Sequence, residues 1–162
     1  MKKKICYLDM DGVLADFEKT LFELHPEVLN YQPDDRKKVV DDFCQTDAGR
    51  RIFHDLDPIE DAIESFNLLC EHYDVYMLST PMWVVPESYS DKRIWVERVL
   101  GPNAEQRLIL SHHKNLLRGD YLIDDRLKHG VDEFEGEHIH FGQPGFETWK
   151  KVIAYLRKKD NW

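Results

Sequence analysis

Two aspartates separated by a single residue are the feature of this chain that points most directly to chemistry. Asp9 and Asp11 follow the apolar run Ile5–Leu8, which is typical of a buried parallel strand, and Gly12 lets the chain turn away behind them. In open α/β sheets, ligands bind where the strands end. Two carboxylates at such a point can share one metal ion and one substrate.

Strand-like and helix-like segments alternate along the chain. Five short apolar segments are predicted to be strands, at 5–9, 74–79, 107–110, 120–124 and 137–141. Three segments with apolar side chains at helical spacing are predicted to be helices, at 61–72, 88–99 and 146–157. This alternation favours an α/β fold in which a parallel sheet carries helices on both faces. Right-handed crossovers would bring the carboxyl ends of all strands to one edge.

The predicted sheet edge gathers hydroxyl groups, a lysine and further carboxylates beside the first two acids. Its members on the later strands are Ser79, Thr80, Lys114, Asp124 and Asp125. Crowded carboxylates repel one another unless a cation lies among them, and oxygen ligands without a thiolate favour Mg²⁺. A hydroxyl and an ammonium group can hold the remaining oxygens of a phosphate. One carboxylate could then attack phosphorus and form an aspartyl-phosphate, while a second protonates the leaving oxygen.

The segment 18–56 interrupts the alternation, because it is charged and shows helical periodicity without a clear strand. It is predicted to form three short helices, at Glu18–Leu24, Asp34–Phe43 and Ala48–Phe53. We therefore expect two units, an α/β core made of residues 1–17 and 57–162 and a small helical cap made of residues 18–56. Asp16 is expected to cap the first helix of the insertion.

Net charge and cysteine content narrow the classes of function. A formal charge of −9 disfavours a nucleic-acid polymer as the partner, because no basic field would gather its phosphates; a small phosphorylated ligand is compatible with it. Cys6, Cys44 and Cys70 are odd in number and lack CxxC spacing, which indicates buried thiols in a reducing cytoplasm. No apolar stretch is long enough to span a membrane. Asp9 and Asp11 interrupt what would be the apolar region of a signal peptide. The sequence indicates no oligomeric state.

The order of these chemical groups resembles the haloacid dehalogenase (HAD) superfamily. Asp9-Met-Asp-Gly-Val-Leu-Ala fits the first motif of its phosphatases, Ser79 the second, Lys114 the third and Asp124-Asp125 the fourth. Longer stretches are similar to the 5′(3′)-deoxyribonucleotidase branch: Asp-Met-Asp-Gly-Val-Leu-Ala-Asp-Phe-Glu at 9–18, Ser-Thr-Pro at 79–81, Trp-Val-Glu at 95–97 and Leu-Ile-Asp-Asp-Arg at 122–126. The resemblance implies a Rossmann-like core with a cap inserted after the first strand. It also implies a Mg²⁺-dependent phosphomonoesterase that acts on (deoxy)ribonucleoside monophosphates.

The resemblance assigns a role to each matching acid. Asp9 would be the nucleophile and a Mg²⁺ ligand. Asp11 would be the general acid and base, with its backbone carbonyl on the metal. Asp125 would be the other direct metal ligand, and Asp124 a supporting acid.

The resemblance also assigns the groups that hold the substrate. Ser79, with Thr80 beside it, and Lys114 would bind the phosphate. Lys92 matches another lysine near the phosphate in this branch. Phe17 matches an aromatic residue that borders the substrate pocket in relatives.

The chain departs from this branch in two places that bear on nucleotide specificity. The insertion is shorter than the deoxyribonucleotidase caps and lacks an obvious aromatic pair matching their base pocket. Its aromatic candidates for facing the substrate are Phe17, Phe22, Tyr31, Phe43 and Phe53. His112 stands where the animal relatives are expected to have an arginine.

Two alternatives stay open. One is a HAD phosphatase for another small phosphorylated metabolite, and the other is a non-catalytic phosphoacceptor like a receiver domain. Receivers place the acceptor on a later strand and need no general acid two residues on, so Asp9, Asp11 and the inserted cap favour the enzyme.

Histidines and tryptophans outside the motifs have simpler interpretations. The pairs His112-His113 and His138-x-His140 are interpreted as strand or surface histidines rather than metal ligands. Trp95 and Trp149 lie on apolar helical faces and are interpreted as core residues. Trp83 follows the second motif, and for it a base-stacking role is less easily dismissed than for the other two.

Overall fold

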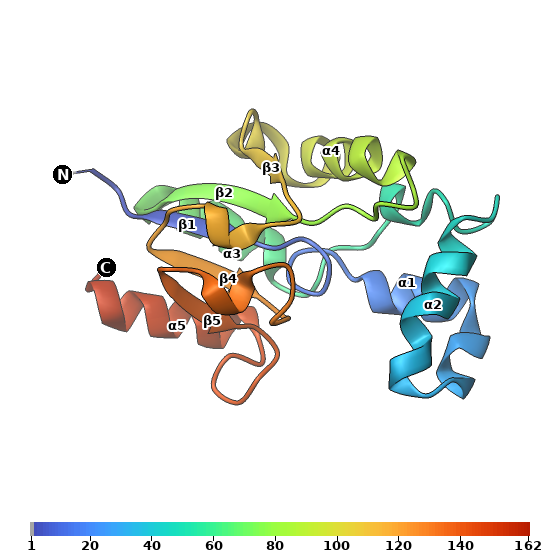
Figure 1. Cartoon of the computed structure of the whole chain (residues 1–162). Coiled ribbons are helices and arrows are strands. Elements are labelled where there is room, and N and C mark those ends of the chain that lie inside the picture. Colours follow the sequence, from blue (N-terminus) through green and yellow to red (C-terminus); the bar gives the residue numbers. More distant parts are fainter. Residues whose placement is uncertain (1) are drawn as a thin grey trace.

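Five parallel strands form the centre of the computed structural model, which describes residues 2–162 (Figure 1). They are β1 (Ile5–Leu8), β2 (Asp74–Ser79), β3 (Leu108–Leu110), β4 (Tyr121–Asp124) and β5 (Glu137–His140). Their order in the sheet is β3-β2-β1-β4-β5, so β1 and β4 lie side by side. The predicted parallel α/β sheet is confirmed. The carboxyl ends of these two neighbouring strands carry the acidic motifs.

One face of the sheet is covered by the three long helices that follow the insertion in the described chain. These helices are α3 (Ala62–His72), α4 (Glu87–Leu100) and α5 (Trp149–Asp160). Cys6 and Leu8 of β1 point toward this face, in one core with Phe66 of α3 and with Trp95 and Trp149, which are fully buried on α4 and α5. Both tryptophans are core residues, as the sequence predicted.

The two buried tryptophans also fix the loops that border the site. Trp95 Nε1 donates a hydrogen bond to the Leu56 carbonyl at 2.8 Å, and Trp149 Nε1 donates to the Val13 carbonyl at 2.9 Å. Each indole thereby satisfies its polar group while burying a large apolar surface. The loop after β1 and the chain returning from the insertion are both anchored to helices behind the sheet.

The opposite face of the sheet has a thinner cover. Tyr7, Leu78 and Leu122 pack there against Val131 and Phe134. The covering elements include the short 3₁₀ helices η4 (Lys114–Leu116) and η5 (Val131–Glu133), which lie in front of the sheet in Figure 1. Helices therefore occur on both faces, as predicted, but the long ones share one face and short turns occupy the other.

The insertion forms a helical lobe to one side of the sheet (Figure 1). It contains α1 (Phe17–Leu24), η1 (Pro26–Asn30), α2 (Pro33–Cys44) and η2 (Ile52–His54). The Asp16 side chain accepts a hydrogen bond from the Lys19 amide at 3.1 Å, so its predicted capping role is confirmed. Asp16 N also donates to the Asp57 carbonyl at 2.8 Å, so the chain leaves the core and returns to it side by side. The division into two units with these boundaries stays a prediction.

The predicted helix Ala48–Phe53 is wrong. Residues 46–51 form turns, and only the 3₁₀ helix η2 follows them. A Cβ on Gly49 would lie 2.3 Å from the Phe43 carbonyl oxygen, so the chain doubles back here against the end of α2. Helical periodicity in the sequence does not reveal this close backbone approach. No helix in residues 2–162 has the length and apolar character needed to cross a membrane.

Candidate active site

The loop after β1 is a tight turn that favours a glycine at position 12. The Met10 carbonyl accepts hydrogen bonds from the backbone amides of residues 13–15, at 3.2, 2.8 and 2.8 Å. Gly12 has φ +80°, a conformation that is costly for residues with a Cβ. A Cβ at this position would also lie 2.4 Å from Asp125 Oδ2. Gly12 therefore allows the loop after β1 and the loop after β4 to approach each other.

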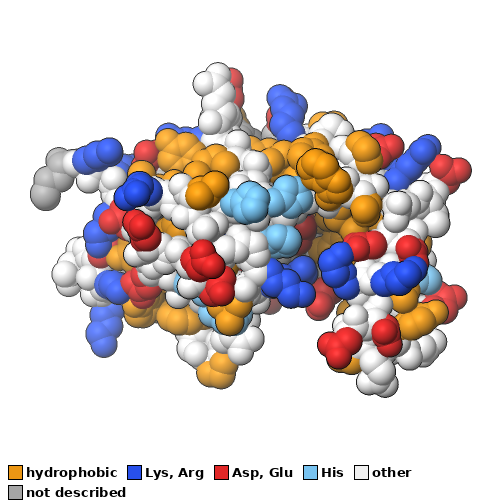
Figure 2. Space-filling view, in the orientation of Figure 1, with side chains coloured by type: hydrophobic (Ala, Val, Ile, Leu, Met, Phe, Trp, Pro, Cys, Tyr) orange, Lys and Arg blue, Asp and Glu red, His pale blue; other side chains and the backbone are white. Residues whose placement is uncertain are grey.

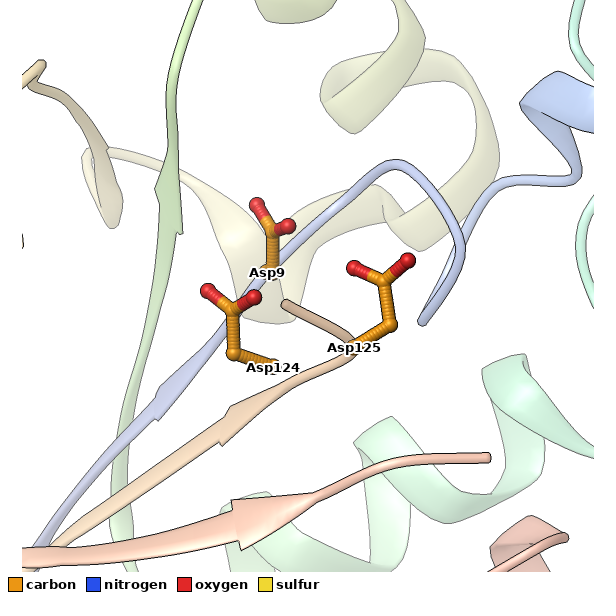
Figure 3. Close-up of side chains that lie close together, drawn as sticks. All are labelled: Asp9, Asp124 and Asp125. Carbon is orange, nitrogen blue, oxygen red and sulfur yellow. The ribbon is translucent and has the colours of Figure 1, made fainter. Parts of the chain in front are cut away.

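Three carboxylates converge at this edge of the sheet. Asp9, Asp124 and Asp125 each offer an oxygen within 4.8 Å of the others, and their side chains gather around one space (Figure 3). They come together because β1 and β4 are neighbours and both end here. Asp9 and Asp124 are buried, and Asp125 is partly buried. The arrangement could hold one divalent cation.

Lys114 ties two of these acids together. Its side chain is 2% exposed, and its Nζ lies 3.0 Å from Asp9 Oδ1 and 2.5 Å from Asp124 Oδ2. Its backbone amide donates to the His129 carbonyl at 2.7 Å, which fixes the residue at the start of η4. Burial by itself lowers the pKa of Lys114, but the two carboxylates raise it overall, so the ammonium form is retained.

The other two acids of the cluster titrate at unusually high pH. Burial, followed by the charge of Asp9, raises the pKa of Asp124 to about 6, although Lys114 opposes the shift. Burial raises the pKa of Asp125 to about 7, and Arg126 opposes that shift. Asp124 Oδ1 accepts a hydrogen bond from the Arg126 amide at 2.9 Å, whereas the buried Asp125 Oδ1 has no partner within residues 2–162. A cation among these oxygens would offset the cost of burying them.

Asp11 lies outside the three-acid cluster and faces a second lysine. Lys92 on α4 is fully buried, and its Nζ donates to Asp11 Oδ2 at 2.6 Å. The same ammonium lies 4.7 Å from the centre of the Phe53 ring. The other oxygen, Asp11 Oδ1, is buried and has no hydrogen-bond partner in the described chain. The two aspartates of the first motif therefore have different surroundings, each set by its own lysine.

The two hydroxyl groups at the end of β2 also differ. Ser79 is fully buried, and its Oγ lacks a hydrogen-bond partner among the residues described. Thr80 Oγ1 donates instead to the Ser111 carbonyl at 2.8 Å, which joins the ends of β2 and β3. The Ser79 hydroxyl thus keeps its hydrogen-bonding capacity unused among the described residues, while that of Thr80 is engaged in the fold.

Almost the whole chain matches the sequence pattern of one known protein family. The family model described as "5′ nucleotidase, deoxy (Pyrimidine), cytosolic type C protein" matches residues 3–162. The chain belongs to this family. It is a phosphomonoesterase of the 5′(3′)-deoxyribonucleotidase type, as the motifs predicted.

Relatives of this nucleotidase family match over most of the chain. A protein of Vibrio phage KVP40, assigned to the 5′(3′)-deoxyribonucleotidases, is 45% identical over 98% of this chain and 87% of its own. A Bordetella bronchiseptica protein with the same assignment is 39% identical over 91% of this chain and 94% of its own. The human cytosolic-type 5′(3′)-deoxyribonucleotidase is 30% identical over 83% of this chain and 77% of its own.

Solved structures are similar to this nucleotidase in fold. The HAD hydrolase YfnB of Bacillus subtilis, solved with bound magnesium, has a TM-score of 0.63 at 10% identity and covers 96% of this chain and 99% of its own. The HAD-like protein SP0104 of Streptococcus pneumoniae has a TM-score of 0.62 at 10% identity over 95% of this chain and 98% of its own. At such identities the likeness confirms the HAD fold alone.

Two histidines that the sequence left as ordinary strand residues support the acidic pair of this nucleotidase. His138 Nε2 lies 3.0 Å from the Asp124 carbonyl oxygen, and His140 Nε2 lies 3.0 Å from that of Asp125. Both project from β5, the strand next to β4. Their spacing of two residues was the available signal, because alternate residues of a strand point to the same face.

The predicted pocket aromatic Phe17 lies against another aromatic of the insertion. Its ring stacks on that of Phe53 with centres 5.2 Å apart, and both side chains are buried. Phe43 stacks on His25 in the same lobe. Three of the candidate aromatic side chains of the insertion are therefore stacked within the lobe, whereas Tyr31 is 45% exposed.

Proposed function

We propose that this nucleotidase removes the phosphate of (deoxy)ribonucleoside monophosphates with Mg²⁺ as its cofactor and Asp9 as the attacking group. The observation that carries the proposal is the convergence of Asp9, Asp124 and Asp125 around one space, with Lys114 in contact and Ser79 at the end of the neighbouring strand β2. The family's description and its human relative's name support a nucleotide as the substrate.

The donor set fits Mg²⁺. Asp125 Oδ1 is a buried oxygen without a partner within residues 2–162, and burial keeps the pKa values of Asp124 and Asp125 high. The candidate ligand atoms of the cluster are all carboxylate oxygens, which suit a hard cation. Asp9 and Asp125 would hold the ion together with the Asp11 backbone carbonyl, and Asp124 would support them. When bound, Mg²⁺ would offset the negative charges of the phosphate and the carboxylates.

The surroundings of Asp9 suit a nucleophile. Lys114 engages Asp9 Oδ1, so the carboxylate is oriented before the substrate arrives. The other oxygen, Oδ2, would attack phosphorus, and the bond from phosphorus to the sugar oxygen would break. Ser79 Oγ and Lys114 Nζ would hold the phosphate oxygens during the transfer, with Lys92 nearby.

Asp11 would move the protons of both steps. Lys92 engages its Oδ2, which leaves the buried Oδ1 as the atom that would give a proton to the departing sugar oxygen. The same oxygen would then accept a proton from the water that attacks the aspartyl-phosphate. That second step breaks the bond between Asp9 and phosphorus, releases inorganic phosphate and restores both carboxyl groups.

Turnover of a panel of substrates, with and without Mg²⁺, tests the proposal. Deoxyribonucleoside, ribonucleoside and sugar monophosphates would be compared by phosphate release. We expect nucleotide hydrolysis that chelation of Mg²⁺ abolishes and that Asp9→Asn lowers by roughly 10³-fold or more. Asp132→Asn, at an exposed aspartate on η5, is the matched control and should keep full activity.

Three results would count against the proposal. Wild-type turnover by folded Asp9→Asn would exclude this nucleophile. A clear preference for sugar phosphates would favour another metabolite. Phosphorylation without turnover would favour a receiver-like acceptor.

We also propose a cytoplasmic location. The family model carries the description "cytosolic type", and Cys6, Cys44 and Cys70 are free thiols in the structure.

A further inference from the structure

An exposed tryptophan lies just beyond the phosphate-binding end of β2. Trp83 is three residues after Thr80, in the loop between β2 and α4, and is 79% exposed. A tryptophan open to this degree leaves a large apolar surface in water. Neither the fold nor the proposed chemistry accounts for it.

Trp83 stands at the outer end of a row of aromatic rings that begins beside the site. The backbone carbonyl of His129 accepts a hydrogen bond from the Lys114 amide. The centre of the His129 ring lies 6.1 Å from the centre of the His112 ring. The His112 ring lies 5.9 Å from that of Trp83. Figure 2 shows histidine side chains gathered beside hydrophobic ones on the face that carries η4 and η5. The row therefore extends outward from the phosphate site.

The indole in this row is supported but not covered. Its contact with His112 is edge-to-face, with an angle of 74° between the rings, so at most one indole face is occupied. His112 Nε2 in turn lies 3.3 Å from the Tyr89 hydroxyl of α4, which restrains the imidazole. An indole that His112 contacts and that keeps at least one face open is suited to stack on another planar ring.

Trp83 is more open than any aromatic side chain of the insertion, of which Tyr31, at 45% exposed, is the most open. Phe17 and Phe53 are 9% and 2% exposed and stack on each other. A nucleoside monophosphate held by its phosphate at Lys114 carries its base one sugar ring away, in reach of the surrounding loops. The continuity of the row with the phosphate site favours the base of the substrate over any other occupant of the exposed indole.

We propose that Trp83, braced by His112, is the platform on which the nucleobase of the substrate stacks. The inference rests on the proposed function and adds to it a specificity-determining residue on the core rather than on the insertion. Stacking recognises the flat face common to all bases, so it predicts preference for a nucleotide over a bare sugar phosphate with little discrimination among bases.

The test compares a deoxyribonucleoside 5′-monophosphate with deoxyribose 5-phosphate, which has the same sugar and phosphate but no base. We expect Trp83→Ala to lower the ratio of the two kcat/KM values by about 5- to 20-fold, mainly through KM for the nucleotide. Trp83→Phe should keep most of the ratio, because a phenyl ring still stacks. Leu116→Ala, at a side chain that is 73% exposed on η4, should leave the ratio unchanged.

The outcomes separate this inference from the proposed function. If the wild-type protein hydrolyses nucleotides and Trp83→Ala keeps the wild-type ratio, the stacking role is wrong and the proposed function stands. Equal losses on both substrates would also overturn it, because they would place Trp83 at the phosphate or in the fold. If the wild-type protein hydrolyses no nucleotide, both are wrong.

Discussion

Two buried lysines orient the two aspartates of the first motif. Lys114 is 2% exposed and faces Asp9, and Lys92 is fully buried and faces Asp11. Removing one partner of such a pair leaves an uncompensated buried charge, which is strongly destabilising. Each carboxylate thus compensates the charge of a buried lysine, and each lysine fixes the position of its carboxylate. The carboxylates are therefore positioned before the substrate binds, which is how an enzyme avoids reorganising its charges during the reaction.

The proposed proton transfer by Asp11 predicts a dependence on the leaving group. Asp11→Asn should slow the hydrolysis of a nucleotide by roughly 10²- to 10⁴-fold, because an alkoxide needs a proton to leave. The first-turnover release of nitrophenolate from its phosphate ester should slow far less, since nitrophenolate leaves unprotonated. The asparagine oxygen can still accept the hydrogen bond from Lys92. Rapid-mixing measurements on both substrates would check this, and equal losses would contradict the acid role.

The sequence predicted which motif residues come together, but it did not predict which other residues contact and orient them. Asp9, Asp124 and Asp125 were predicted to meet, because parallel strands end at one edge, and they do. The partnership of Lys92 with Asp11 could not be read from the sequence, because it depends on how far α4 lies from β1. The contacts of His138 with the Asp124 carbonyl depend in the same way on strand order.

Helix α4 joins the insertion to the site through two neighbouring residues. Lys92 faces Asp11, and Asp91, also fully buried, faces Arg51 just before η2. Arg51 Nε donates to Asp91 Oδ2 at 2.9 Å, and its Nη2 lies 2.8 Å from Oδ1. Arg98 of the same helix donates to the His54 carbonyl at 2.6 Å. The end of the insertion is thereby attached to the helix that orients the proposed general acid.

Removing the ion pair between Arg51 and Asp91 should lower the stability of the protein. Arg51→Gln is expected to lower the free energy of unfolding by about 1–3 kcal/mol, because it leaves Asp91 buried without its cation. Arg51 is half exposed, and water screens part of the loss. Adding Asp91→Asn should restore most of the stability, which a double-mutant cycle in urea would measure.

A neighbouring arginine supplies the control for this cycle. Arg50 pairs with Asp47, and both side chains are at least half exposed. Arg50→Gln should change stability by less than about 1 kcal/mol. If the two arginine variants were equally stable, or if Asp91→Asn added its own loss to that of Arg51→Gln, the buried pair would not have the role inferred here.

The strands and the longer helices were predictable from the sequence, and the short third helix of the insertion was not. Residues 61–72 show helical periodicity over three turns, and α3 is found at Ala62–His72. The helix expected at 146–157 is found as α5 (Trp149–Asp160), three residues further on, because the chain turns at Gly145 with φ +96°. In the insertion, close packing of Gly49 against the backbone replaced the expected third helix by turns. Contacts between distant residues decide such short segments, and local propensity does not.

The two ends of the sheet have different roles. The residues proposed for catalysis lie at the carboxyl ends of the strands, and a cluster of stabilising hydrogen bonds lies at the amino ends. The acids, Lys114 and Ser79 lie at the carboxyl ends of the strands. At the amino ends, Asp160 near the end of α5 accepts hydrogen bonds from Lys4 before β1, Tyr73 before β2 and Tyr121 of β4. This second cluster joins the first and last elements of the described chain at a distance from the chemistry. Its loss should therefore affect stability without affecting turnover.

Asp160→Asn tests that separation. It should lower the free energy of unfolding at pH 7 by about 1–3 kcal/mol, because Lys4 and two tyrosines lose a charged acceptor. Burial by itself raises the pKa of Asp160, but these hydrogen bonds lower it overall. A carboxyl group with a lowered folded pKa contributes stability above its unfolded pKa of about 4 and loses it as the pH falls further. The stabilities of wild type and variant, measured by urea unfolding from pH 7 downward, should therefore begin to converge as the pH falls below about 4. Asp42→Asn, which removes an exposed ion pair with Lys38, is the control and should have little effect at any pH. A difference that stayed constant below about pH 4, or a loss of turnover at 25 °C, would contradict a purely structural role for Asp160.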